Sequence, residues 1–190
     1  NVVVWLRPDS DDKADEFPRA RVHPDLAKPK PRDHTVIAAG GRFVPRVVAA
    51  RAGDTITFDN RLPVPTNVKY DVYDDSDRAF NLLVGKDMGH TAKPLPVVRS
   101  CDIFSSSIHP WMRGYVRAFD HPYFAVTDAA GGFELPQVPA GTWRLVAWHE
   151  RAGFLGESGR LGQKITVPAN RTGRQPLAPL VFDSDRWVGP

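Results

Sequence analysis

Short apolar runs separated by glycine-rich turns are the feature of this sequence that most restricts its fold. The run Thr55–Phe58 alternates polar and apolar side chains, as does Trp143–His149, and Gly40–Gly41 forms a turn between two other runs. Alternation places successive side chains on opposite faces of a β-strand, so we expect Ile56 and Phe58 to face a core. No segment long enough for a stable helix shows helical periodicity. The sequence therefore predicts an all-β protein built from short strands.

The composition supports this class and excludes several functions. The chain has 190 residues with 18 prolines and 15 glycines, many for a helical protein but suited to turns between strands. Its net charge of +3 is spread over alternating basic and acidic residues, so we expect no nucleic-acid partner. No apolar run approaches the roughly 20 residues that a membrane-spanning helix needs. One cysteine excludes an intrachain disulfide.

The chain begins at Asn1 rather than at a methionine, which favours an earlier processing step. We therefore expect that a signal peptide has been removed and that the protein is periplasmic or extracellular. Residues 9–32 are charged and interrupted by prolines, which predicts a surface linker. The predicted strands lie within Asn1–Leu6, Thr35–Ala38, Phe43–Ala50, Thr55–Phe58, Val68–Tyr73, Phe80–Val84, Val97–Phe104, Gly114–Phe119, Tyr123–Thr127, Trp143–His149, Gln163–Val167 and Leu180–Phe182.

One stretch looks most like a site: Ser105–Tyr115 sets His109 and Met112 three residues apart in an aromatic-flanked turn. Imidazole nitrogen and thioether sulfur are ligands that copper accepts. A plain structural alternative is a packed turn, with the imidazole bonded to backbone and the methionine against Trp111. The only cysteine, Cys101, has the strand parity of Val97 and Ile103, which favours a core position over a ligand role.

Three segments together resemble a known family. Gly40–Pro45 with Arg51–Asn60 resembles the front half of a cupredoxin of the plastocyanin and methylamine-utilisation-like kind, and Ser106–Tyr115 resembles its back half. The resemblance implies a Greek-key β-sandwich with a type 1 copper site. It also implies that Thr66 and Asn67 stand where a His-Asn pair is expected.

The same resemblance implies that the copper site is degenerate. Ser106 stands where the ligand cysteine is expected, which leaves only His109 and Met112 of the usual set. A serine hydroxyl does not replace a thiolate as a copper ligand. We therefore expect no cofactor, with copper bound through an atypical set as the alternative. The candidate metal residues are His109, Met112, Cys101, Thr66 and Ser106.

The C-terminal part resembles a second family, the carboxypeptidase-regulatory-like, transthyretin-type module. The resemblance rests on His121–Asp128, Gly132–Leu135, Val138–Thr142 and Trp148–Glu150. Modules of this type have an early apolar strand, and Asn1–Leu6 matches it. We therefore predict a cupredoxin-like domain, residues 33–119, inserted into a smaller transthyretin-like sandwich formed by residues 1–8 and 120–190.

These observations favour a non-catalytic interaction or scaffold module with an unknown protein or surface partner. The alternatives are a copper-binding electron-transfer protein and a carbohydrate-binding module, the latter suggested by Trp5, Trp111, Trp143, Trp148 and Trp187. The serines beside His109 have no nucleophile elbow or glycine-rich oxyanion loop, so we predict no catalytic residues. Asn67, His121, His149 and Glu150 remain candidates for another polar site.

Overall fold

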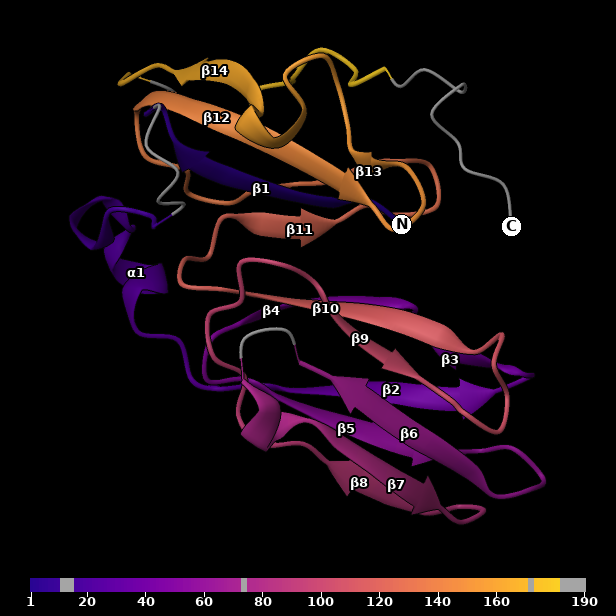
Figure 1. Ribbon diagram of the computed structural model, residues 1–190. Coiled ribbons are helices and arrows are strands. Elements are labelled where there is room, and N and C mark those ends of the chain that lie inside the picture. The colour runs from indigo at the N-terminus through magenta and orange to yellow at the C-terminus, as the bar shows by residue number, and fades with distance from the viewer. Residues whose placement is uncertain (11–15, 73–74, 171–172, 182–190) are drawn as a thin grey trace. The chain divides into compact units, whose positions relative to one another are not determined.

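The computed structural model describes residues 1–10, 16–72, 75–170 and 173–181. The chain forms two compact units (Figure 1): unit 1 comprises Asn1–Lys28 with His121–Pro190, and unit 2 comprises Pro29–Asp120. The described elements are almost entirely strands, so the prediction of an all-β fold is confirmed. No helix in the described ranges is long and apolar enough to cross a membrane.

Unit 2 is a sandwich of two sheets whose buried side chains form one core. Parallel pairing joins β4 to β10 and β2 to β5, and the other pairs are antiparallel. In strand order, one sheet contains β4 (Val47–Arg51), β10 (Arg113–Phe119), β9 (Asp102–Ser105), β6 (Thr66–Asp71) and β7 (Phe80–Val84). The other contains β3 (Arg42–Val44), β2 (Asp33–Ala39), β5 (Thr55–Asn60) and β8 (Gly89–Thr91).

The core of unit 2 follows the alternation of its strands. Ile56 and Phe58 of β5 are buried as predicted, while Thr55 and Thr57 are partly exposed. Phe58 packs edge-on against Phe104 of β9, with ring centroids 5.3 Å apart. Burial of such side chains contributes about 1.5–3 kcal/mol each, so this core fixes which face of every strand points outward.

Strand direction gathers several loops at one end of unit 2. The parallel register of β2 and β5 places Ala38 beside Asn60, so the turn after β2 and the loop after β5 leave the sandwich together. The antiparallel pairs place Thr66 beside Val84 and Arg113 beside Ser105. The Gly40–Gly41 turn and loops 61–65, 85–88 and 106–112 therefore share this end, which we call the loop end (Figure 1).

The described residues of unit 1 form one five-stranded sheet with strands from both ends of the chain. β1 (Val3–Pro8) lies between β11 (Phe124–Val126) and β12 (Gly141–His149), and Val4 pairs with both Ala125 and Ala147. β12 also pairs with β13 (Gly153–Phe154) and β14 (Gln163–Val167). Val4 and Leu6 are buried in the core of this unit with Trp143 and Leu145.

The segment predicted as a surface linker is partly built into unit 1. It contains a 3-10 turn, η1 (Arg19–Arg21), and the short helix α1 (Pro24–Ala27). Phe17 is fully buried and stacks on Trp143 with ring centroids 4.7 Å apart. Tyr123 also packs against Phe17, with ring centroids 4.9 Å apart. The segment therefore supplies a core residue despite its charge.

Other strand predictions differ from the structure in detail. Pro45 interrupts the predicted run Phe43–Ala50 and separates β3 from β4, because proline lacks the N–H that a continuous strand would donate. β8 was not predicted, and β9 begins only at Asp102. Leu180 and Val181 are not in a strand, and Phe182 lies outside the described residues.

Candidate metal centre

Three of the predicted site residues meet at the loop end of unit 2. Thr66 is the first residue of β6, Ser106 follows β9, and His109 lies in the loop that leads to β10. Oγ1 of Thr66 lies 3.0 Å from Nδ1 of His109 and 3.2 Å from Oγ of Ser106. Thr66 and Ser106 are buried, whereas His109 is partly exposed. The structure thus brings together three of the positions that the resemblance assigned to copper ligands.

Asn67 holds the loop that carries His109. Its Oδ1 accepts hydrogen bonds from the Ser106 hydroxyl at 2.9 Å and from the backbone N–H groups of Ser107 and Ile108 at 2.8 and 3.0 Å. Its Nδ2 donates to Oδ1 of Asn81 on the neighbouring strand at 2.7 Å. One buried amide therefore ties β6 and β7 to the loop, which fixes where the imidazole lies.

The donors and acceptors of this cluster are already paired with one another. The Ser106 hydroxyl donates to Asn67, and its oxygen accepts the backbone N–H of His109 at 3.0 Å. The Thr66 hydroxyl bridges Ser106 and the imidazole Nδ1. Because the hydroxyl proton of Ser106 points to Asn67, Ser106 is not placed as a nucleophile activated by His109.

Met112 and Trp111 differ sharply in burial, although the packed-turn alternative packs one against the other. The side chain of Met112 is 1% exposed and packs in the apolar core, whereas Trp111 is 71% exposed. Trp111 is edge-on to His109, at 5.4 Å between centroids, and its Nε1 donates to the carbonyl of Gly41. The packed-turn alternative gives the imidazole a backbone partner, whereas the structure places Nδ1 of the ring against the Thr66 hydroxyl. The ring is held by a side-chain hydroxyl instead.

Cys101 lies outside the cluster. It precedes β9, and five extended steps at about 3.3 Å each separate it from Ser106 by about 16 Å. In this strand Asp102 and Phe104 are buried, so Cys101 has the opposite parity from the core residues, which corrects the predicted core position. Burial raises the pKa of its thiol to about 11, the nearby Asp102 charge adds to the rise, and Arg117 opposes it. The thiol is therefore protonated at neutral pH.

These donors do not fit the copper site that the family resemblance implies. Type 1 sites need a thiolate and two imidazoles, but Thr66 and Ser106 offer hydroxyls that already hydrogen-bond one another. The single imidazole uses Nδ1 for the Thr66 contact. Within the described ranges, no group of three or more His, Cys, Asp or Glu side chains is arranged to hold a metal ion.

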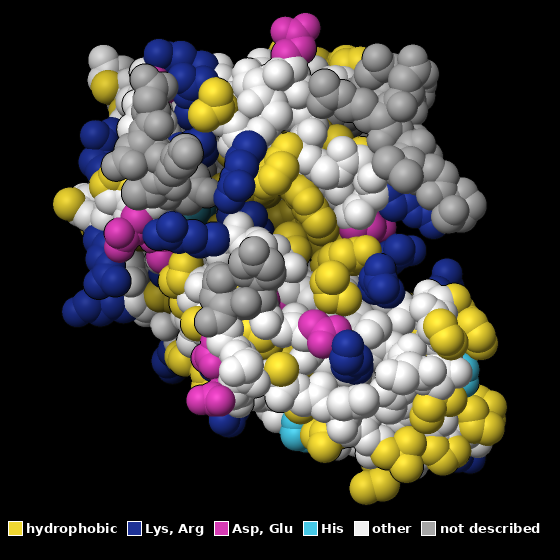
Figure 2. Space-filling model, viewed as in Figure 1, with side chains coloured by type: hydrophobic (Ala, Val, Ile, Leu, Met, Phe, Trp, Pro, Cys, Tyr) yellow, Lys and Arg dark blue, Asp and Glu magenta, His cyan; other side chains and the backbone are white. Residues whose placement is uncertain are grey.

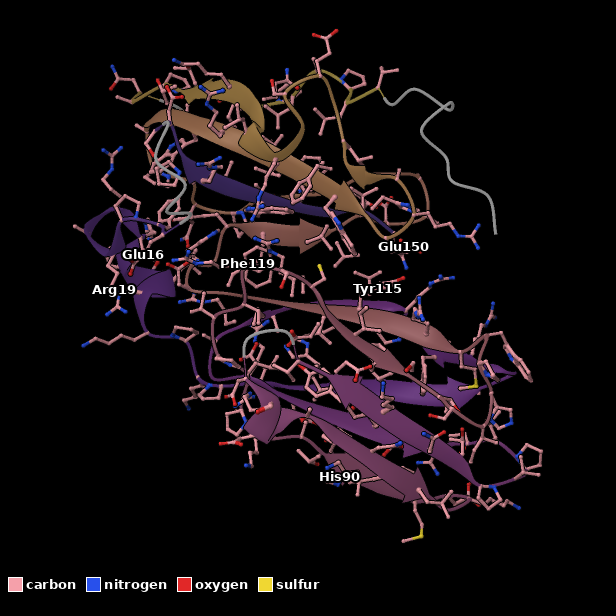
Figure 3. All side chains as sticks on the ribbon, viewed as in Figure 1. Glu16, Arg19, His90, Tyr115, Phe119 and Glu150 are labelled. Carbon is pink, nitrogen blue, oxygen red and sulfur yellow. The ribbon has the colours of Figure 1, made fainter. Side chains whose placement is uncertain are left out.

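The remaining candidate polar residues lie in unit 1 and have structural contacts. His121 is buried, its Nδ1 accepts the backbone N–H of Tyr123 at 3.1 Å, and its ring packs on Phe17. His149 ends β12. Glu150, which is labelled in Figure 3, is the next residue. Nε2 of His149 lies 3.2 Å from Oε2 of Glu150, while Nδ1 accepts the N–H of Arg151. Because Nδ1 accepts this N–H, the proton of the neutral ring is on Nε2.

Two features of the loop end were not predicted from the sequence. One is the hydrogen bond from Asn67 to Asn81, which the β6–β7 register places opposite Lys69, two residues along β6 from Asn67. The other is the exposure of large apolar side chains such as Leu83, which is 70% exposed. The uncharged run of β7 predicts a strand, but its pattern does not mark Leu83 as an outward-facing residue.

Comparison with known proteins gives only distant structural neighbours. No protein-family model matches the chain, and no curated protein matches its sequence. A reduced mutant of amicyanin is 20% identical with a TM-score of 0.40, over 60% of this chain and 98% of that one. A copper-containing nitrite reductase (NirK) from Thermus scotoductus SA-01 is 22% identical with a TM-score of 0.41, over 48% of this chain and 23% of that one. At these identities and scores, the comparisons assign the chain to no family.

Proposed function

We propose that this protein is an extracytoplasmic, non-catalytic interaction module. In this proposal, unit 2 is a cupredoxin-like sandwich in which hydrogen-bonded hydroxyls take the place of copper ligands, and unit 1 is a transthyretin-type module. The observation that carries the proposal is the contact of Thr66 with both Ser106 and His109. The sequence resemblance of these positions to copper ligands, together with their actual proximity, supports the alignment on which it rests.

The chemistry of the cluster supports a structural role. A hydroxyl keeps its proton at neutral pH and so donates hydrogen bonds where a thiolate would bind a metal. Asn67 completes the network by accepting three donors from the loop. The loop is thereby held in place by the chain itself, so that it can present a fixed surface without a metal ion.

Copper titration tests this proposal. We expect no intense visible thiolate-to-copper band when copper is added to the oxidised protein, because position 106 is serine. Thr66→His combined with Ser106→Cys should create copper binding with such a band. The matched control, Thr66→His with Ser106→Ala, supplies the imidazole without the thiolate and should not.

Two results would contradict the proposal. An intense band in the parent protein that Cys101→Ser abolishes would establish the electron-transfer alternative instead. A folded double variant that takes up no copper would show that Thr66 or Ser106 is wrongly aligned.

The structure gives less support to the other candidate functions, although Trp111 is exposed. The extended strand β9 keeps Cys101 about 16 Å from Ser106. Cys101 therefore does not complete a copper site with His109. For carbohydrate binding, Trp5 and Trp143 are buried and cannot stack on a sugar from solvent. Trp187 lies outside the described residues.

A further inference from the structure

Large apolar side chains are exposed together at the loop end of unit 2. Soluble proteins bury most such side chains, so a group of them marks an interaction surface. Figure 2 shows apolar side chains gathered at this end of the sandwich. The group consists of Val44, Val64, Leu83, Met88, Ile108 and Trp111, which are all between 45% and 71% exposed.

Hydrogen bonds fix the loops that carry these side chains to one another. Asn60 donates through Nδ2 to the carbonyl of Val64 at 3.0 Å and to that of Gly85 at 3.2 Å, which joins loops 61–65 and 85–88. Trp111 joins its loop to the β2–β3 turn through the carbonyl of Gly41. The apolar side chains therefore protrude from a fixed set of loops.

The charges at the loop end are mainly positive. Asp59 and Asp87 both pair with Arg61, each at 3.6 Å. Among the residues that the structure describes, no ion pair is present for Lys86 or Arg113, both of which are exposed. Exposed Arg42 begins β3 at the same end. The surface thus combines apolar loop tips with an excess of cations.

We propose that the loop end binds an anionic lipid surface, with the apolar tips entering the interface and the cations contacting the headgroups. This inference rests on the proposed function, since it names the partner of an interaction module. Trp111 has the amphipathic ring that favours the headgroup region, and cations near an anionic bilayer each strengthen binding. Lipid headgroups diffuse within the bilayer and can reach Lys86 and Arg113 at any position on this surface. A lipid partner therefore needs no fixed arrangement of charges complementary to these two cations. A second copy of the chain would place like charges opposite each other.

Vesicle co-sedimentation of the full chain tests the proposal. The probes are phosphatidylcholine vesicles and vesicles of phosphatidylcholine with phosphatidylglycerol. We expect binding only to the anionic vesicles, weaker at high salt because screening reduces the attraction. Leu83→Ser with Ile108→Ser should reduce the partition coefficient at least about tenfold, because two apolar groups no longer enter the interface. Lys86→Glu with Arg113→Glu should reduce it at least about twentyfold, since each cation contributes about fivefold.

Matched controls separate the loop end from general effects. Leu161→Ser removes an exposed leucine of unit 1, and Lys30→Glu with Arg32→Glu makes the same charge change before β2, at the opposite end of unit 2. Both should bind as the parent does. Brominated lipid should quench tryptophan emission of the parent on anionic vesicles, and Trp111→Phe should remove most of that quenching.

Failure to bind anionic vesicles at low salt would overturn the lipid inference, as would equal loss in the control variants. If an amphipathic peptide with acidic flanks binds the loop end while vesicles do not, the surface is a protein-docking site. Neither result alters the copper titration, so failure of this inference remains distinct from failure of the proposed function.

Discussion

Asn67 offers the sharpest test of how the loop at the candidate site is held. The variant Asn67→Leu keeps a similar side-chain volume but removes three accepted hydrogen bonds and the one donated to Asn81. A net hydrogen bond contributes about 0.5–1.5 kcal/mol, and exposed Ser107 and Ile108 can recruit water after the change. We therefore expect the free energy of unfolding to fall by about 2–4 kcal/mol, as measured by urea titration followed by circular dichroism.

Two further variants assign that loss to the acceptor oxygen. Asn67→Asp keeps an acceptor for all three donors and should stay within about 1 kcal/mol of the parent. Asn81→Ala removes only the donated bond and should cost about 1 kcal/mol. If Asn67→Leu costs no more than Asn81→Ala, the three bonds accepted by Asn67 do not hold the loop.

Two more predictions concern stability. Burial opposes ionisation of Asp54, but hydrogen bonds from His34 and two backbone N–H groups outweigh it and hold its pKa below the ordinary 3.8. Its carboxylate should therefore stabilise the fold fully above that value and lose its effect as the pH falls through the lower native pKa. In a plot of the free energy of unfolding against pH, Asp54→Asn should reduce the loss of stability at acidic pH. An unchanged loss in the variant would contradict this prediction. Phe17→Ala should lower the free energy of unfolding of unit 1 by about 3–5 kcal/mol in urea titrations and should expose Trp143 to quenchers. The control Glu16→Ala should have neither effect. Equal effects of the two variants would mean that Phe17 is not a core residue.

Periodicity and resemblance predicted the parts of this molecule that depend on local pattern. The alternation around Ile56 and Phe58 was enough to assign the buried face of β5, because a strand has only two faces. The contact between Thr66, Ser106 and His109 required long-range pairing of β6 with β9. That contact was predicted only through the family resemblance, since no local rule brings β6 beside β9.

Predictions from sequence pattern are wrong where a polar side chain is buried or where an apolar side chain stands alone in a polar segment. Asp102 is buried because it accepts a hydrogen bond from Tyr70, so the apolar residues around it suggested the wrong parity for Cys101. Phe17 stands alone in a charged stretch and has no periodic partner to mark it as core. The direction of the Ser106 hydroxyl depends on Asn67, which no single-sequence pattern fixes.

The pairing of β1 with β12 has a consequence for the order of folding during synthesis. The register places Val4 beside Ala147, so the ribosome must add about 140 residues before the first strand meets its central partner. At roughly 5–20 residues per second, that delay is on the order of ten seconds. Unit 2 has all of its strands before then, whereas β1 waits as an exposed apolar segment. The apolar residues of β1 therefore wait longer for their central partner than β4 of unit 2 waits for β10.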